Sequence, residues 1–196
     1  MIITIARQYG SGGRKIGELL AQRLGYQYYD REILTMAAEK SSIHPDVAKR
    51  FDEKPASSLL YTAYMAGGGM DENIPLNQKL AIAQFDAIRS LSESGNCIFV
   101  GRCADMVLQK RTDLLRLFLH APLEWRVQRA IKIYEVPEAL AEKTVKKADK
   151  TRADYYEFFT QKKWGACNNY DLSINTSLLG IEGTVDQLAA MIESRK

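Results

Sequence analysis

The feature that most constrains this chain is its opening stretch, in which a short β-branched run leads into a glycine-rich turn and then into a helical pattern. The run covers residues 2–6, and after the turn apolar residues recur at helical spacing up to Leu24, where Gly25 is suited to end the helix. The turn consists of Gly10, Ser11, Gly12 and Gly13. A strand, a tight turn and a helix in this order aim backbone N–H groups and a helix N-terminus at one point, which favours phosphate. A flexible turn without a ligand is the competing interpretation, and the flanking strand and helix argue against it.

The turn lacks the lysine of the standard phosphate-binding loop, whose pattern is G-x-x-x-x-G-K-[ST]. In that alignment Arg7 stands at the first glycine, Gly13 at the lysine and Arg14 at the hydroxyl residue, while Gly12 keeps the second glycine. Arg14 and Lys15 begin the helix, where a positive charge opposes the helix dipole but suits a bound polyphosphate. Either is a candidate to replace the missing lysine.

Composition excludes several classes of protein. The 196 residues suit one domain, and 27 basic against 24 acidic residues give a net charge of +3, which is too balanced to indicate nucleic-acid binding. Three widely spaced cysteines and two histidines match no zinc-site spacing. The sequence shows neither a leader pattern nor an apolar run approaching 18 residues, so we expect a cytoplasmic protein without a membrane partner.

Short apolar runs alternate with helical patterns along the whole chain. Runs typical of buried parallel strands lie at residues 2–6, 97–100, 114–120 and 172–175, with a weaker one at 27–29. Helical patterns lie at residues 14–24, 32–40, 76–94, 123–133, 138–163 and 182–194. This alternation predicts a layered α/β fold with its ligands at the carboxyl ends of the strands.

Two segments depart from this pattern. Residues 41–75 carry three prolines and three consecutive glycines, which fits either a helical insertion over the active-site mouth or an irregular surface excursion. Residues 138–164 are densely charged, which is typical of a solvated helix face. Their position before the last strand also suits a closing lid.

Six motifs resemble one family in the same order. They are I-T-I-A-R-Q-Y-G-S-G-G-R at residues 3–14, Y-Y-D-R-E at 28–32, E-K-P-A-S-S-L-L-Y at 53–61, V-G-R-C-A-D at 100–105, Y-Y-E-F-F-T-Q-K-K-W at 155–164 and Y-D-L-S-I-N-T-S at 170–177. Through them the chain resembles the cytidylate kinase-like branch of the nucleoside monophosphate kinases. The resemblance implies one three-layer α/β domain with the P-loop NTPase fold: a five-stranded parallel sheet with helices on both faces, an insertion and a lid.

The resemblance also implies which residues bind the acceptor nucleotide. They are Asp30, Arg102, Asp149 and Arg152. The sequence departs from true cytidylate kinases at three further positions, where Val100 replaces an acidic residue and Val145 and Met36 replace arginines.

The implied reaction is transfer of the γ-phosphate of ATP, with Mg²⁺, to a nucleoside monophosphate such as CMP or dCMP, or to a related small acceptor. We expect the backbone of residues 10–14 to cradle the donor phosphates and Arg14 or Lys15 to supply charge. Arg102 holds the acceptor phosphate, and Asp105 helps to order the hydration of magnesium. The groups expected to close over the transferring phosphate are Lys150 and Arg152, with Arg126 or Arg129.

Some of these residues have a structural alternative. Asn175 and Thr176 resemble the loop that touches the donor adenine, and an N-cap for a following helix is the competing explanation. Arg126 and Arg129 could instead form surface ion pairs, for example with Glu124, and Asp149 could cap a helix or pair with a neighbouring charge.

Two other functions compete with the kinase interpretation. One is a nucleotide-binding regulator that kept the scaffold and lost the lysine, coupling ligand binding to a conformational change. The other, a nucleic-acid binder using residues 138–163, has weaker support because acidic residues dilute that patch. The expected partners are therefore nucleotides, and not nucleic acids or membranes.

Overall fold

The computed structural model of the chain describes residues 1–30, 33, 35–36 and 76–194. The expected insertion at residues 41–75 and most of the expected helix at 32–40 lie outside the described residues. None of the helices in the described part is long and apolar enough to cross a membrane.

The centre of the fold is a five-stranded sheet in which every neighbouring pair is parallel. Its strands, in the spatial order β2-β3-β1-β4-β5, are β2 (Gln27–Tyr29), β3 (Cys97–Val100), β1 (Ile2–Arg7), β4 (Leu114–His120) and β5 (Leu172–Asn175). All five expected strands are present, and β1 extends one residue further than expected, to Arg7. Because β1 lies in the middle, the loop that follows it emerges at the centre of the carboxyl edge.

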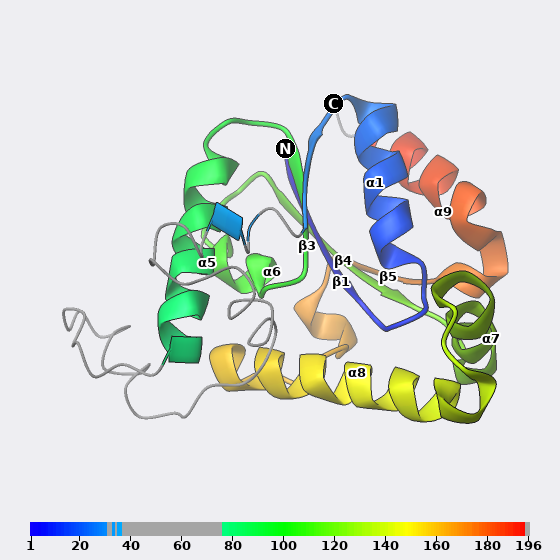
Figure 1. Cartoon of the computed structure of the whole chain (residues 1–196). Coiled ribbons are helices and arrows are strands. Elements are labelled where there is room, and N and C mark those ends of the chain that lie inside the picture. The colour runs from blue at the N-terminus through cyan, green and yellow to red at the C-terminus, as the bar shows by residue number, and fades with distance from the viewer. Residues whose placement is uncertain (31–32, 34, 37–75, 195–196) are drawn as a thin grey trace.

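Helices cover both faces of the sheet, as expected for a three-layer fold (Figure 1). The helices are α1 (Gly13–Leu24), α5 (Leu76–Ser92), α6 (Ala104–Val107), α7 (Leu123–Tyr134), α8 (Glu138–Thr160) and α9 (Thr176–Glu193), and a 3₁₀ turn η1 (Cys167–Asn169) precedes β5. Alternation along β1 divides the core, since Ile3 and Ile5 pack with α1 and α9 while Ile2 packs with α5.

Helix α8 runs along the carboxyl edge of the sheet (Figure 1). It is one continuous helix of 23 residues, because its apolar face is buried at both ends. Near the start Ala141 and Val145 are buried, and near the end Tyr155, Tyr156 and Phe159 join a hydrophobic cluster with Phe85 of α5. The charged segment expected as a solvated face or a lid is therefore anchored by its aromatic residues.

Helix α9 begins six residues earlier than expected. Gly180, with φ 67° and ψ −172°, interrupts the helical backbone, so the apolar periodicity marks only the part after it. The first turn forms because Asn175 caps it, its side chain accepting a hydrogen bond from the Ser177 backbone N–H at 3.1 Å.

Candidate active site

The loop between β1 and α1 is a tight turn that leaves the start of α1 open to an anion. Gly10 and Gly12 both have φ 82°, in the left-handed region that glycine adopts without strain. Ser11 is fully buried, and its hydroxyl donates a hydrogen bond to the Gln8 carbonyl at 2.9 Å. No side chain in the described part of the chain caps α1 at Gly12, so the first N–H groups of the helix lack a side-chain partner there.

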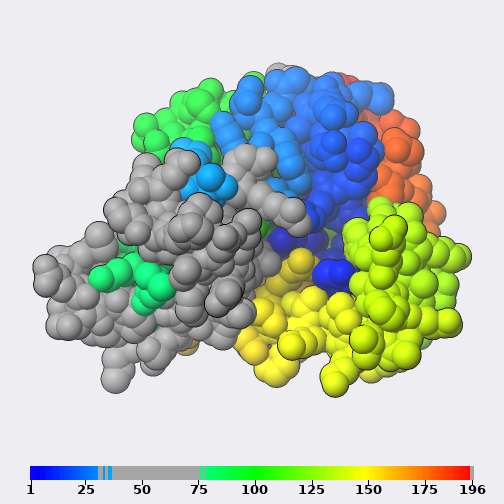
Figure 2. Space-filling view, viewed as in Figure 1, coloured from blue at the N-terminus to red at the C-terminus, as the bar shows by residue number. Residues whose placement is uncertain are grey.

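Neighbouring helices lie so close to this loop that side chains on Gly10 and Gly12 would meet them. A Cβ atom on Gly10 would lie 2.7 Å from the carbonyl oxygen of Arg126 in α7, and one on Gly12 would collide with Ile181 in α9. In Figure 2, dark blue atoms from the start of the chain reach the surface between α8, in yellow, and α7, in yellow-green.

Gly13, at the position of the missing lysine, faces the side chain of Arg7. A Cβ atom on Gly13 would lie 2.6 Å from Cβ and 2.9 Å from Cγ of Arg7. Arg7 is itself buried, with 6% of its surface exposed. The volume that the stem of a lysine at position 13 would need is therefore filled by the stem of an arginine at position 7.

A pocket of about 380 Å³ opens over the loop. Its walls are formed by Arg7, Gln8, Tyr9, Gly10, Gly13, Arg14, Tyr134 and Arg152. Three arginines and no carboxylate line it among the described residues, so the pocket is suited to a polyanion. Arg14 and Arg152 were expected at this site, whereas Arg7 was missed; the available signal was an arginine in place of glycine at the end of a buried strand.

Two further cavities adjoin this pocket. A cavity of about 570 Å³ shares Arg14 and Tyr134 with it and extends past Lys15 and Tyr28 to Arg129. A small one of about 20 Å³ shares Arg7 and Arg152 and reaches Arg102 and Asp105. The three cavities form a row along the carboxyl edge, where ligands of parallel α/β sheets bind.

Asp30, at the end of β2, holds two of the expected arginines together. Its carboxylate accepts hydrogen bonds from Arg14 Nε and from Arg102 Nη1, each at 2.5 Å, and 3% of the residue is exposed. Burial alone would raise the pKa of Asp30, but the charges of Arg102, Arg7 and Arg14 and the hydrogen bond from Arg102 lower it below its ordinary value. Asp30 therefore stays ionised and fixes both guanidinium groups.

Arg102 is held in an unusual backbone conformation. Gly101, Arg102 and Cys103 have φ values of 80°, 53° and 52°, so two residues with side chains adopt the left-handed region in succession. Arg102 is 3% exposed and also donates to the Val100 carbonyl at 2.9 Å. Strain of this kind persists where the surroundings fix a side chain in one place, and it is concentrated at functional sites.

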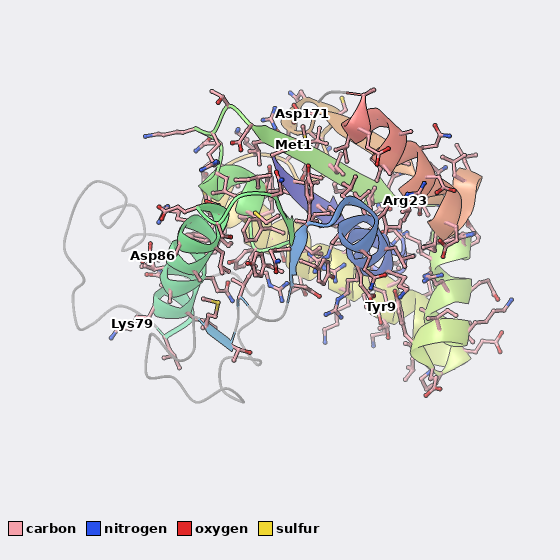
Figure 3. The ribbon with its side chains drawn as sticks, turned by 90° about the horizontal axis from the view of Figure 1, so that it is seen from above. Met1, Tyr9, Arg23, Lys79, Asp86 and Asp171 are labelled. Carbon is pink, nitrogen blue, oxygen red and sulfur yellow. The ribbon has the colours of Figure 1, made fainter. Side chains whose placement is uncertain are left out.

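Helix α8 contributes two of the expected residues directly to the loop. Arg152 donates to the Arg7 carbonyl at 3.3 Å, and its guanidinium lies 5.8 Å from the centre of the Tyr9 ring. Asp149 accepts the Tyr9 backbone N–H at 2.6 Å and pairs with Arg126 Nη1 at 2.5 Å. Figure 3 shows Tyr9 beside α7, the helix that carries Arg126.

Arg126 and Asp149 thus have a structural role in this geometry, because their buried ion pair fastens α7 and α8 to the loop. Arg126 also donates to the carbonyls of Ala121 and Tyr9, at 2.9 and 3.1 Å. The alternative from the sequence was a surface ion pair, and the pair that Arg126 forms is instead a buried one with Asp149. A contact of Arg126 with the donor nucleotide stays a prediction.

Arg129 and Lys15 lie at the edge of the loop. The guanidinium of Arg129 lies 5.8 Å from the centre of the Trp125 ring, and its buried Nε has no hydrogen-bond partner in the part of the chain that the structure describes. Lys15 pairs with Glu18 at 3.2 Å and its side chain is half exposed. Arg129 is therefore the better placed of the two to receive a ligand beside Gly12.

Asn175 and Thr176 support the fold at this site. Asn175 is the N-cap of α9, which is the alternative that the sequence left open. Thr176 is fully buried, and its hydroxyl donates to the carbonyl of Ser11 at 2.8 Å. Both residues hold the loop and α9 in place, and the burial of Thr176 argues against a direct contact of its side chain with adenine.

Asp105 is bonded within the protein in this geometry, and its expected role in ordering the hydration of magnesium stays a prediction. It accepts a hydrogen bond from the Tyr156 hydroxyl at 2.9 Å, and burial raises its pKa above the ordinary value, which favours the neutral acid. Among the described residues, no group of three or more histidine, cysteine, aspartate or glutamate side chains is arranged to hold a metal ion.

Comparison with known proteins places this geometry in a wider context. The model of the cytidylate kinase-like family matches residues 2–178. A crystal structure of an uncharacterized protein from Eubacterium ventriosum is 31% identical, with a TM-score of 0.76 over 99% of this chain and 98% of that one. No curated protein matches the sequence.

The fold is also similar to that of shikimate kinases. The enzyme from Bacteroides thetaiotaomicron is 12% identical, with a TM-score of 0.57 and 98% of each chain covered. The enzyme from Acinetobacter baumannii, solved with shikimate, is 15% identical, with a TM-score of 0.54 over 100% of this chain and 94% of that one. At this identity the likeness concerns the kinase-like fold alone.

Proposed function

The chain belongs to the cytidylate kinase-like family, and we propose that it transfers the γ-phosphoryl group of ATP to a nucleoside monophosphate of cytidylate type or to a related small acceptor. The observation that carries this proposal is the pocket over the glycine loop, where Arg7, Arg14 and Arg152 converge without a carboxylate among the described lining residues. Such a pocket combines helix amides and guanidinium groups, the two kinds of donor that bind phosphate.

Phosphoryl transfer requires little of the protein beyond positioning and charge neutralisation. In the proposed reaction the bond between the γ-phosphorus and its bridging oxygen breaks, and a bond to an acceptor oxygen forms. The amides at the start of α1 bind the donor phosphates, and Arg152, reaching in from α8, donates to the migrating group. Developing charge on the phosphoryl oxygens is thereby met by donors already in place.

Arg102 is the proposed ligand of the acceptor phosphate. It follows the carboxyl end of β3, its Nη1 donates to Asp30, and it lines the small cavity that adjoins the pocket over the loop. A buried arginine preorganised by a carboxylate loses little side-chain entropy when it binds a second anion.

The described residues include no cluster of three or more histidine, cysteine, aspartate or glutamate side chains arranged to hold magnesium. Arg14 stands where the usual loop hydroxyl would be, and Asp105 is bonded to Tyr156. Magnesium in such enzymes is held largely by substrate phosphates and water, so it would enter with the nucleotide, and we assign no step to it.

A nucleotide-binding regulator is the second candidate function. It is favoured by the absence of the loop lysine and by the engagement of both Arg14 and Arg102 by Asp30. In that case ATP binds without transfer.

The test is an acceptor screen on purified protein with ATP and Mg²⁺, following ADP formation with each nucleoside monophosphate. We expect turnover that depends on the acceptor and falls about 100-fold in Arg152→Ala, the effect typical of losing one donor to a developing charge. Arg23→Ala, an exposed arginine of α1 paired with Asp186, is the matched control and should retain full activity. ATP binding without turnover on any acceptor would replace the kinase with the regulator.

A further inference from the structure

We propose that Arg7 does the work of the missing loop lysine, so that the phosphate-binding charge has moved from position 13 to position 7. The inference rests on the proposed function, which it deepens by naming the residue that binds the transferring phosphates. It starts from two departures from the standard loop, arginine in place of the first glycine and glycine in place of the lysine.

In the folded loop these two departures amount to moving one side chain from position 13 to position 7. Because a Cβ on residue 13 would lie 2.6 Å from the Cβ of Arg7, the loop has room for a side chain at one of these positions and not at both. The standard loop places that side chain on its seventh residue, and this chain places it on the first. The stem of Arg7 thus starts 2.6 Å from the point where the stem of the lysine would start.

The surroundings of Arg7 fit a phosphate ligand. Arg7 lines both the 380 Å³ pocket over the loop and the small cavity that Arg102 also lines. It projects from the end of the central strand, so it lies between the loop amides and the residues proposed for the acceptor. A guanidinium group at this point can bridge two phosphate oxygens with parallel hydrogen bonds, which the single ammonium group of lysine cannot do.

Arg14 and Lys15, the two candidates that the sequence offers, lie nearer the surface than Arg7, with side chains 43% and 50% exposed against 6% for Arg7 as a residue. Arg14 is bound to Asp30 through two of its nitrogens, one of them Nε. Lys15 pairs with Glu18 on the surface of α1. The role of Arg7 is electrostatic: it donates hydrogen bonds to phosphate oxygens, and no bond to Arg7 forms or breaks during transfer.

A four-protein cycle tests the exchange. The wild type, Arg7→Gly, Gly13→Lys and the double variant Arg7→Gly/Gly13→Lys are titrated with ATP by calorimetry, with circular dichroism and thermal unfolding as checks on folding. We expect each single variant to lose about 10- to 100-fold in ATP affinity, one through the lost charged hydrogen bonds and the other through the collision. The double variant should recover most of that loss, because it rebuilds the standard loop, and such recovery is strongly non-additive.

Charge and shape are separated by a second pair of variants at the same position. Arg7→Lys keeps a cation and should retain affinity within about tenfold, whereas Arg7→Met keeps an apolar stem of similar length and should lose the full 10- to 100-fold. Arg7→Met that folds and binds ATP like the wild type would overturn the proposal, as would a double variant no tighter than the weaker single one.

The outcomes also separate this proposal from the proposed function. If the wild type binds ATP but phosphorylates no acceptor, the kinase assignment fails while the affinities still decide the role of Arg7. If the wild type turns over and Arg7→Met does so equally well, the role of Arg7 fails while the kinase assignment stands. A wild type that does not bind ATP overturns both.

Discussion

Asp30 organises the candidate site at the scale of single residues, because one buried carboxylate fixes two arginines from distant parts of the chain. Arg14 comes from the loop after β1 and Arg102 from the turn after β3, and both contact Asp30 at hydrogen-bond distance. Without that carboxylate the positive charges of Arg7, Arg14 and Arg102 would lie together uncompensated by it, and two of these arginines are buried. The positions of Arg14 and Arg102 therefore depend on a residue that does not line the pocket over the loop.

Removing the charge of Asp30 should destabilise the fold strongly. We expect Asp30→Asn to cost roughly 3 kcal/mol in the free energy of unfolding, since it leaves the Arg102 guanidinium buried without its counter-charge. Urea unfolding measures this, with Asp186→Asn, which breaks the exposed pair with Arg23, as a control expected to cost less than about 1 kcal/mol. Equal costs for the two variants would contradict the account.

The same carboxylate predicts a dependence of stability on pH. The folded state lowers the pKa of Asp30, so its stabilising contribution is complete above the unfolded pKa of about 3.9 and is lost as the pH falls through the lower, folded value. Asp30→Asn should therefore weaken the acid dependence of the unfolding free energy in that range.

Asp105 should change the stability with pH in the opposite direction. Burial raises its pKa, so the folded protein keeps a proton that the unfolded chain has already released, and stability falls as the pH rises from about 3.9 to the folded pKa. Asp105→Asn keeps an acceptor for the Tyr156 hydroxyl and removes the ionisation. Its unfolding free energy, measured in urea from pH 4 to 8, should lack that decline; an unchanged pH profile would show that Asp105 is not the titrating group.

Part of the site could be predicted from single residues and part could not. Arg102 could be placed at the carboxyl edge because it follows a glycine directly after an apolar run, whereas Asp30 was named only through the resemblance to the family. Arg7 was missed, because an arginine in place of the first loop glycine shows a departure from the pattern but not what its side chain does. Its contact with residue 13 is a property of the folded turn.

At the scale of elements, α8 is fastened to the phosphate loop by a carboxylate that accepts a loop amide. Asp149 binds the Tyr9 N–H and the Arg126 guanidinium together. The helix is thereby fixed at its middle to the loop and at its end to the aromatic cluster, which sets the position of Arg152 between them.

Breaking this attachment should loosen the loop more than it harms the rest of the fold. We expect Asp149→Ala to cost about 3 kcal/mol, because Arg126 is buried, and to speed hydrogen exchange at the Tyr9 amide. Glu142→Ala, which removes an exposed i,i+4 pair with Lys146 on the same helix, should cost about 0.5 kcal/mol or less. Unchanged exchange at Tyr9 in Asp149→Ala would contradict the attachment.

Helix ends offer an independent check on the backbone. Glu135 ends α7 with φ 54°, in the left-handed conformation that Gly25 adopts at the end of α1 with φ 69°. We expect Glu135→Gly to raise the thermal midpoint by stabilising the fold by about 0.5 to 1 kcal/mol, and Gly25→Ala to destabilise it by about 1 kcal/mol. Shifts of the same sign would contradict these assignments.

Elements with a regular apolar period could be predicted from the sequence, and those broken by a local conformation could not. The five strands and α1, α7 and α8 lie within a few residues of their expected bounds. The start of α9 was missed because Gly180 breaks its period, and α6 was missed because four residues are too few to show one.

At the scale of the whole molecule, arginines gather at the carboxyl edge of the sheet, although basic and acidic residues nearly balance over the chain. The net charge is +3 over 196 residues, yet three arginines line one pocket and a fourth, Arg102, lies in the adjoining cavity. The parallel sheet causes this, because it brings the ends of β1, β2 and β3 and the side of α8 to the same edge. The total charge of a chain therefore says little about the potential at such a site.

The central claim is that the loop after β1 binds the triphosphate of a nucleotide, and hydrogen exchange of its amides with and without ATP tests it most directly. The account predicts slower exchange at residues 10–14 on addition of saturating ATP, with no change at exposed amides of α5 on the opposite face of the sheet. If ATP binds and these loop amides exchange at the same rate as in the free protein, the claim is contradicted.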